Sequence, residues 1–98
     1  MQIFGLKNCD TCRKAKKHYP NATLIDVREM AIEDAILARA IAQFGDSIVN
    51  RSSKTWRDLT DAERAQTPEQ IIRAYPAVMK RPLILHDDDQ LTLGFKPA

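Results

Sequence analysis

The sequence predicts an α/β protein, a sandwich in which a parallel pair of strands from the N-terminal half joins an antiparallel pair from the C-terminal half. Three observations predict it. Two short runs of apolar and branched residues, 2–5 and 22–27, flank a helical pattern, as in a parallel βαβ unit. The middle of the chain carries apolar residues at helical spacing. Finally, LILH (83–86) and QLTLGF (90–95) flank an Asp-rich turn, as in a β-hairpin.

Size and composition are typical of a small globular protein. The 98 residues can close one hydrophobic core, so we expect a single domain over residues 1–98. Hydrophobic residues at 44% and charged residues at 29% argue against a disordered chain. The apolar runs are far shorter than the roughly 20 residues of a membrane span, and the start does not resemble a secretory signal. We therefore expect a cytoplasmic protein without a membrane partner, and a net charge of +2 does not indicate nucleic-acid binding.

The N-terminal third predicts a strand, a helix and a second strand. Residues 2–5, QIFG, form a short apolar strand that Gly5 ends. From Asp10 to about residue 19, apolar or small side chains recur at helical spacing, and Pro20 stops the pattern. ATLIDV, residues 22–27, is rich in branched side chains and predicts the second strand.

The middle of the chain predicts helices. Apolar residues repeat every three or four positions from about Met30 to Phe44, and Gly45 follows where a C-terminal cap belongs. TDAE (60–63) and TPEQ (67–70) each place a threonine three residues before an acid or amide, which is the order of a capping box. We expect a helix after each, the second with proline at its first position.

Both cysteines lie in LKNCDTCRKAKK, residues 6–17. Cytosolic CxxC pairs are more typical of redox chemistry or metal binding than of a structural disulfide. Cys9 falls where the strand meets the helix, so free backbone N–H groups and the helix dipole favour its thiolate. Arg13, one turn on, and Lys7, on the loop side, add positive charge. We predict a lowered pKa for Cys9, and we predict that Cys12 is the resolving thiol.

Two other interpretations of the cysteine pair remain open. A zinc ion could be held by both cysteines with His18 and His86, but the spacing of these residues is unlike that of known zinc sites, so we expect no metal. Alternatively, the thiols could simply be packed as small hydrophobic groups.

Two arginines outside the cysteine stretch are candidates for binding an anionic substrate. A guanidinium group recognises an oxyanion or a carboxylate through paired hydrogen bonds, and Arg51 and Arg81 are the candidates. Each is also compatible with an ordinary surface role. Arg81 precedes Pro82 at the start of a predicted strand, and a cis bond there would bring backbone groups near the thiol for a substrate to pair with.

Four stretches occur in one order along the chain: IFGLKNCDTCRKA, NRSSKTWRDL, PAVMKRPLIL and LTLGF. With them the chain resembles the ArsC/Spx/YffB family, the arsenate reductase-like branch of the thioredoxin-like fold. KNCDT, TW and LGF are most similar to the YffB branch. The resemblance implies a thioredoxin-like core with a mixed four-stranded sheet, and a helical subdomain inserted at approximately 29–75.

The resemblance also implies site residues. The family's reactive cysteine falls on Cys9, its anion-binding arginines fall on Arg51 and Arg81, and a cis peptide is implied before Pro82. Arsenate reductases of this branch form a thiol adduct with arsenate and use glutathione and glutaredoxin to complete the reduction. They carry a third arginine in the last hairpin, where this chain has residues 94–96, GFK. This departure argues against arsenate as the substrate.

These observations lead us to expect a thiol-dependent reductase. The Cys9 thiolate would attack a small oxyanion or an oxidised thiol, with no bound cofactor, and glutathione, glutaredoxin or thioredoxin would supply electrons. The alternative is a redox-sensing regulator resembling Spx, in which a Cys9–Cys12 disulfide changes affinity for RNA polymerase. A third hypothesis is a protein that keeps the fold but has lost the activity.

Overall fold

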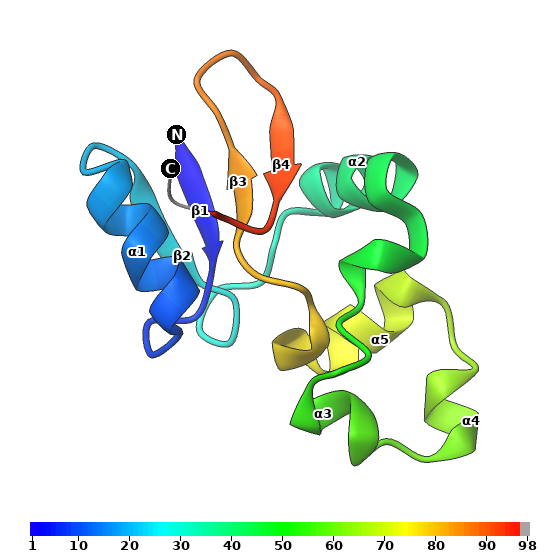
Figure 1. The fold of residues 1–98 in the computed structure, drawn as a ribbon. Helices are drawn as coiled ribbons and strands as arrows, with labels where there is room; N and C mark the ends of the chain where they lie inside the picture. The colour runs from blue at the N-terminus through cyan, green and yellow to red at the C-terminus, as the bar shows by residue number, and fades with distance from the viewer. Residues whose placement is uncertain (97–98) are drawn as a thin grey trace. The chain divides into compact units, whose positions relative to one another are not determined.

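The computed structural model describes residues 1–96, and their contacts divide the chain into two compact units (Figure 1). The first, which we call the sheet unit, contains residues 1–30 and the chain from Arg81 on. The second, the helical unit, spans Ala31–Lys80. The single domain over residues 1–98 stays a prediction, and its last two residues lie outside the described part of the chain.

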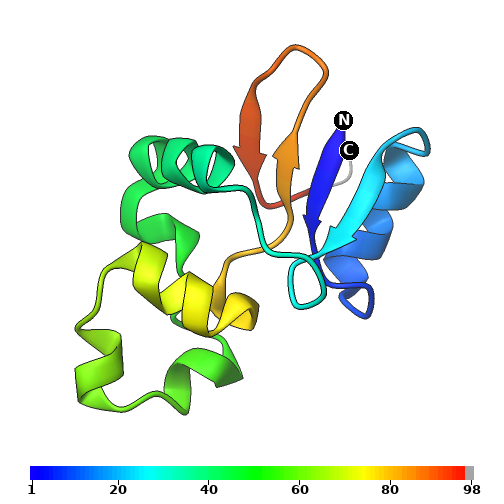
Figure 2. The same ribbon diagram turned by 180° about the vertical axis from the view of Figure 1, so that it is seen from behind.

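The sheet unit contains four strands and one helix. Their bounds are β1 Gln2–Gly5, α1 Asp10–His18, β2 Thr23–Asp26, β3 Leu83–Leu85 and β4 Leu91–Leu93. The strand order is β2-β1-β3-β4; β1 and β2 are parallel, and the β1–β3 and β3–β4 pairs are antiparallel. Helix α1 packs on β1 and β2, as Figure 2 shows from behind. The predicted mixed four-stranded sheet is confirmed.

The packing of β1 against α1 follows from the pattern of apolar residues. Ile3 pairs with Ile84 across the sheet, and both are buried with Ala15 of α1 and with Ala22, which directly precedes β2. A small side chain at position 15 lets the helix approach the sheet closely. Helix α1 ends at His18, where Tyr19 takes a non-helical conformation ahead of a proline.

The hairpin of β3 and β4 is shorter than predicted. Strand β4 ends at Leu93 because Gly94 has φ 83°, a left-handed conformation that a strand residue does not adopt. The Gly94 N–H donates to the carbonyl of Pro82 at 2.8 Å, which closes the base of the hairpin. The carboxyl end of the predicted QLTLGF strand is therefore not part of β4, and Phe95 packs against the buried cluster that contains Ile3 and Ile84.

The helical unit is built from short helices. Their bounds are α2 Asp34–Phe44, η1 Gly45–Ile48, α3 Lys54–Arg57, α4 Asp61–Arg64, α5 Pro68–Ala74 and η2 Pro76–Val78, η denoting a 3₁₀ helix. Both predicted capping boxes are present, with Thr60 before α4 and Thr67 before α5. Gly45 caps α2 through a bond from its N–H to the carbonyl of Ile41, as expected. None of the helices in residues 1–96 is long and apolar enough to cross a membrane.

The predicted start of the second helix at Met30 is wrong, because α2 begins at Asp34. Ile32 is buried, but it is buried from a segment without helical structure. Arg73 of α5 holds this segment by donating to the Ile32 carbonyl at 2.6 Å and pairing with the Asp34 carboxylate. The apolar spacing therefore predicted burial correctly, whereas the long-range bonds of Arg73 decided the backbone conformation.

Candidate active site

Cys9 lies at the N-terminus of α1, as predicted. Strand β1 ends at Gly5, and a short turn leads to Cys9, whose φ of −92° and ψ of 124° make it the N-cap residue of the helix. Its carbonyl accepts the first helical bond, from the N–H of Arg13 at 2.9 Å, and its own N–H donates to the Leu6 carbonyl at 3.2 Å. The residue is partly exposed.

The surroundings of Cys9 favour its thiolate. Burial by itself would raise the pKa of Cys9, but the backbone N–H and the thiol of Cys12 together with the guanidinium of Arg81 lower it below the ordinary thiol value. Donors at a helix start and a nearby cation are the features that activate cysteines in proteins. The predicted direction of the pKa shift is confirmed.

Cys12 has the opposite environment. It is completely buried, and burial together with the neighbouring Cys9 sulfur raises the pKa of Cys12 to about 11, against the influence of the Leu6 backbone and Arg81. Its sulfur lies against Gly5, where an added Cβ would come within 2.3 Å of it. At neutral pH Cys12 is therefore a protonated thiol beside the Cys9 sulfur.

The cation that acts on both sulfurs comes from a distant part of the sequence. Arg81 is half-buried, precedes β3 in the sheet unit, and lowers the pKa of Cys9. The Arg81–Pro82 peptide is cis, as predicted. The antiparallel pairing of β3 with β1 brings Arg81 to the end of the sheet from which the Cys9 turn leaves. This proximity depends on strand pairing, which the sequence did not specify by itself.

Lys7 and Arg13 are engaged in hydrogen bonds with other protein groups. The Lys7 ammonium donates to Glu29 at 2.8 Å, and this interaction raises the pKa of Lys7. The Arg13 guanidinium donates from Nε to the Lys7 carbonyl at 2.9 Å. Their expected part in binding a substrate stays a prediction.

Arg51 belongs to the helical unit. It lies in the turn between η1 and α3, its side chain is 63% exposed, and its guanidinium lies 5.7 Å from the ring centroid of Trp56. Arg64 lies 5.5 Å from the same ring, so the indole has two cationic neighbours. The ion pair of Arg51 with Asp46, at 4.0 Å, is long. The binding role of Arg51 stays a prediction.

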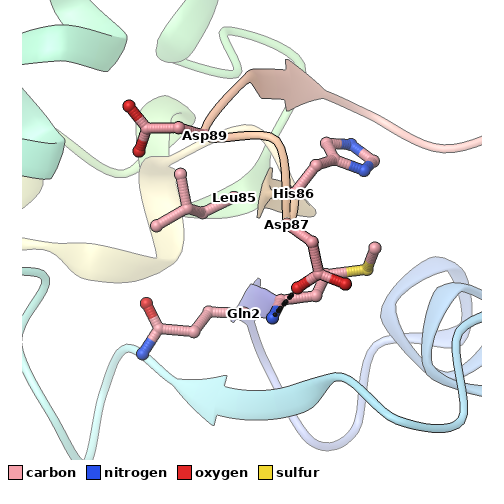
Figure 3. Close-up of a pocket in the computed structure, with 6 residues that line it drawn as sticks. Gln2, Leu85, His86, Asp87 and Asp89 are labelled. Carbon is pink, nitrogen blue, oxygen red and sulfur yellow. Dashed lines mark hydrogen bonds and ion pairs between the residues drawn. The ribbon is translucent and has the colours of Figure 1, made fainter.

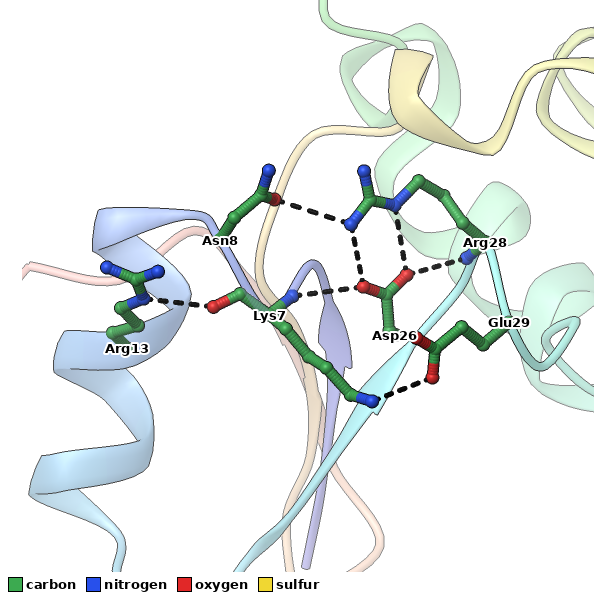
Figure 4. Close-up of polar contacts among 6 residues, drawn as sticks. All are labelled: Lys7, Asn8, Arg13, Asp26, Arg28 and Glu29. Carbon is green, nitrogen blue, oxygen red and sulfur yellow. Dashed lines mark hydrogen bonds and ion pairs between the residues drawn. The ribbon is translucent and has the colours of Figure 1, made fainter.

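One buried charged residue of the sheet unit was absent from the predicted site. Asp26, at the end of β2, is a buried carboxylate that binds the Arg28 side chain and the backbone N–H of Lys7 (Figure 4). The signal was available: an acid lies between Ile25 and Val27 within the run ATLIDV, and an arginine follows it two residues later.

Two surface hollows of the sheet unit lie at the opposite end of β1 from the cysteine turn. One, of 260 Å³, is lined by residues of the β1 start and the hairpin, where Asp87 pairs with the amine of Met1 at 2.7 Å (Figure 3). A second, of 210 Å³, is lined by Met1, Asp87 and residues 18–22. Neither includes a cysteine, so the candidate site is assigned from side-chain chemistry.

The two histidines belong to an aromatic cluster. His18 contacts the rings of Tyr19 and Phe95, Tyr19 also contacts the ring of His86, and His86 Nε2 bonds to the Thr92 hydroxyl at 2.8 Å. Within residues 1–96, no group of three or more metal-ligating side chains converges. Phe95, one of the residues that replace the third family arginine, packs in this cluster.

Comparison with known proteins identifies the family. The profile of the ArsC family matches residues 4–98. An uncharacterized protein of Haemophilus influenzae is 36% identical over 102 residues, covering 95% of this chain and 89% of that protein. The structure of a YffB protein is similar with a TM-score of 0.78 and 30% identity, covering 97% of this chain and 90% of that one. An arsenate reductase (ArsC) related protein from Brucella melitensis gives a TM-score of 0.70 and 28% identity, covering 98% and 87%. The chain therefore belongs to the ArsC family, a family of thiol-dependent, reductase-like proteins with a thioredoxin-like fold.

Proposed function

We propose that the protein is a thiol-dependent reductase that uses Cys9 as its nucleophile and glutathione as its reducing co-substrate. The observation that supports this most strongly is the inequality of the two thiols. Cys9 is partly exposed with a lowered pKa, whereas Cys12 is buried with a pKa of about 11. A reactive outer sulfur beside a protonated inner one suits attack followed by resolution.

The proposed reaction is a two-electron transfer. The Cys9 thiolate attacks one sulfur of an oxidised thiol, forms a mixed disulfide and releases the other sulfur as a thiolate. Cys12 then loses its proton and attacks Cys9, which releases the bound thiol and leaves a Cys9–Cys12 disulfide. Two molecules of glutathione reduce this disulfide and become glutathione disulfide; glutaredoxin or thioredoxin are alternative reductants.

Arginines bind the anionic part of the substrate in this proposal. Arg81 is close enough to Cys9 to act on its pKa, so it can also pair with a carboxylate or oxyanion bound beside the sulfur. Arg51 supplies the second guanidinium, and the backbone next to Pro82 offers hydrogen-bonding groups. A small oxyanion such as arsenate would condense with Cys9 and release water. The related Brucella protein is described as arsenate reductase related, but the hairpin of this chain carries no arginine at residues 94–96.

The test is to trap the adduct. Purified protein is incubated with glutathione disulfide and with arsenate in parallel, and the modified sulfur is identified by mass spectrometry. We expect a glutathione adduct on Cys9 that accumulates in the Cys12→Ser variant, and no turnover in Cys9→Ser. Full activity of Cys9→Ser would falsify the proposal. If only arsenate formed an adduct, the substrate would be an oxyanion and not an oxidised thiol.

The contact between the two sulfurs also supports a second hypothesis. Each thiol acts on the pKa of the other, so the two lie close together, and a peroxide can join them in a disulfide as it is itself reduced by two electrons. A redox-sensing regulator would use that disulfide to change its affinity for RNA polymerase. Retention of the protein on immobilised RNA polymerase, compared between oxidised and reduced samples, separates the hypotheses, because the reductase should show no redox-dependent retention.

A further inference from the structure

Asp26 is a buried carboxylate that the proposed mechanism does not use. Its side chain is 1% exposed, and both of its oxygens are occupied. Oδ1 accepts from the backbone N–H of Arg28 at 2.9 Å and from Arg28 Nε at 3.2 Å. Oδ2 accepts from Arg28 Nη2 at 2.9 Å and from the backbone N–H of Lys7 at 3.1 Å (Figure 4). The carboxylate thus connects the end of β2 to the turn that precedes Cys9.

The turn formed by Lys7 and Asn8 is held on three of its polar groups. Asp26 accepts the Lys7 N–H, and Arg13 of α1 donates to the Lys7 carbonyl at 2.9 Å. Arg28 Nη2 donates to the side-chain oxygen of Asn8 at 3.4 Å. As Figure 4 shows, these contacts reach the turn from β2 and from α1. Cys9 is the next residue, so the position of its sulfur depends on how this turn is fixed.

Stability alone does not require the ion pair of Asp26 and Arg28. An apolar residue at the end of β2 would avoid the cost of removing a carboxylate from water, which an ion pair offsets only with good geometry and further hydrogen bonds. Arg28 provides that geometry through two parallel N–H donors, which a lysine cannot reproduce. A buried charge network at this place therefore indicates a requirement for a defined turn.

We propose that Asp26 and Arg28 are positioning residues for Cys9, which hold the turn of Lys7 and Asn8 so that the Cys9 sulfur stays at the N–H of Cys12. The inference rests on the proposed function, in which Cys9 is the nucleophile. Neither side chain touches the substrate; both act through the backbone and side chain of the turn.

The Asp26→Asn variant tests this through the sign of its effect. If Asp26 acted on Cys9 through charge alone, removing a negative charge would lower the pKa of Cys9. If it acts through position, the sulfur loses its donors and the pKa of Cys9 rises. We expect a rise of about one unit, with alkylation of Cys9 at pH 7 roughly tenfold slower. The measurement is the rate of iodoacetamide modification of Cys9 against pH, followed by mass spectrometry of each sulfur.

Glu29→Gln is the matched control. It removes a carboxylate that pairs with the exposed Lys7 ammonium, but it leaves the backbone bonds of the turn intact. We expect no rise in the pKa of Cys9 in this variant. Continued protection of Cys12 from iodoacetamide shows that each variant is folded, because Cys12 is reached only when the core opens.

Arg28→Lys is a second test, to be used also where Asp26→Asn does not fold. It keeps the positive charge and removes the two-pronged contact, so we expect a smaller rise in the pKa of Cys9. The inference would be overturned if the pKa of Cys9 is lowered in the wild type and does not rise in folded Asp26→Asn or Arg28→Lys protein. The proposed function would then stay intact. An ordinary thiol pKa for Cys9 in the wild type would overturn both.

Discussion

Cys9 and Cys12 are three residues apart, yet their surroundings change their ionisation in opposite directions. Cys9 has donors at the helix start and Arg81, whereas Cys12 is enclosed between α1 and β1. The difference comes from their places along the helix, because Cys9 is the N-cap residue at its end, whereas Cys12 lies inside it and is packed against Gly5 of β1. Reactivity at this site is therefore a property of position rather than of residue type.

Cys9 should be alkylated faster than Cys12 near neutral pH, because only Cys9 carries a useful thiolate fraction and only its sulfur is accessible. The expected ratio at pH 7 is at least on the order of 100, since a pKa of about 11 leaves Cys12 almost fully protonated. Site-resolved mass spectrometry after brief iodoacetamide treatment measures it. Equal rates, or a faster Cys12, would reverse the assigned roles.

Asp26 should make stability depend on pH in the acidic range. Its hydrogen bonds with Arg28 lower its pKa in the folded state well below the value of about 3.9 expected for the unfolded chain. Its stabilising contribution is then fully present above that unfolded value and is lost as the pH falls toward the folded pKa. Urea unfolding should show a gap between wild type and Asp26→Asn that is wider at pH 7 than at pH 3. A gap of equal size at both pH values would contradict this assignment.

The contact between β1 and α1 depends on glycine at position 5. A Cβ on Gly5 would lie 2.3 Å from the Cys12 sulfur, a distance that real Cβ atoms essentially never show, and 3.3 Å from the Cys12 Cβ, which is a tight contact. Strand and helix can pack at their observed separation only because one side of the contact lacks a side chain.

Gly5→Ala should lower the free energy of unfolding by about 1–3 kcal/mol, because overpacking must displace Cys12 or the helix. The penalty should fall in the Cys12→Ala background, where the sulfur that clashes is absent. A double-mutant cycle with chemical denaturation measures this coupling. The same penalty in both backgrounds would mean that position 5 acts through its backbone and not through the Cys12 contact.

The start of α5 depends on a cap formed by side chains. Thr67 accepts from the N–H of Gln70 at 3.3 Å, and the Gln70 side chain accepts from the N–H of Thr67 at 3.1 Å. Thr67→Ala should cost about 1 kcal/mol of stability, and Thr67→Ser should retain most of it because the hydroxyl remains. Thermal or urea unfolding of the two variants provides the comparison, and equal destabilisation by serine and alanine would argue against the cap.

Across the whole molecule, the two predicted anion-binding arginines belong to different units. Arg81 lies in the sheet unit with both cysteines, whereas Arg51 lies in the helical unit beside Trp56. The first can act on the thiol itself and on a substrate. For Arg51, the predicted role is to bind the substrate, without an effect on the thiol.

Substitution of these arginines should therefore give different results. Arg81→Gln should raise the pKa of Cys9 and slow its alkylation by neutral iodoacetamide at pH 7 by about three- to tenfold, because a nearby cation is lost. Arg51→Gln should leave that rate unchanged and raise the KM for an anionic substrate. Alkylation kinetics and turnover, measured on both variants, test the division of roles, which is wrong if both arginines change the alkylation rate equally.

The sequence by itself determined the local features of this protein. Apolar runs and turn residues predicted the strands, threonine-based capping boxes predicted two helix starts, and the position of Cys9 between a strand and a helix predicted its lowered pKa. These features depend on residues a few positions apart, which the sequence shows directly.

Only the tertiary structure decided the interactions between distant residues. Pairing of β3 with β1 brings Arg81 to the thiol of Cys9, which lies 72 positions earlier in the chain. The ion pair of Asp26 with Arg28 reaches across to Lys7, and the bonds of Arg73 keep residues before Asp34 out of α2. Spacing along a chain says nothing about which distant groups will meet, because strand pairing and burial of charge are settled by the packing of the folded chain.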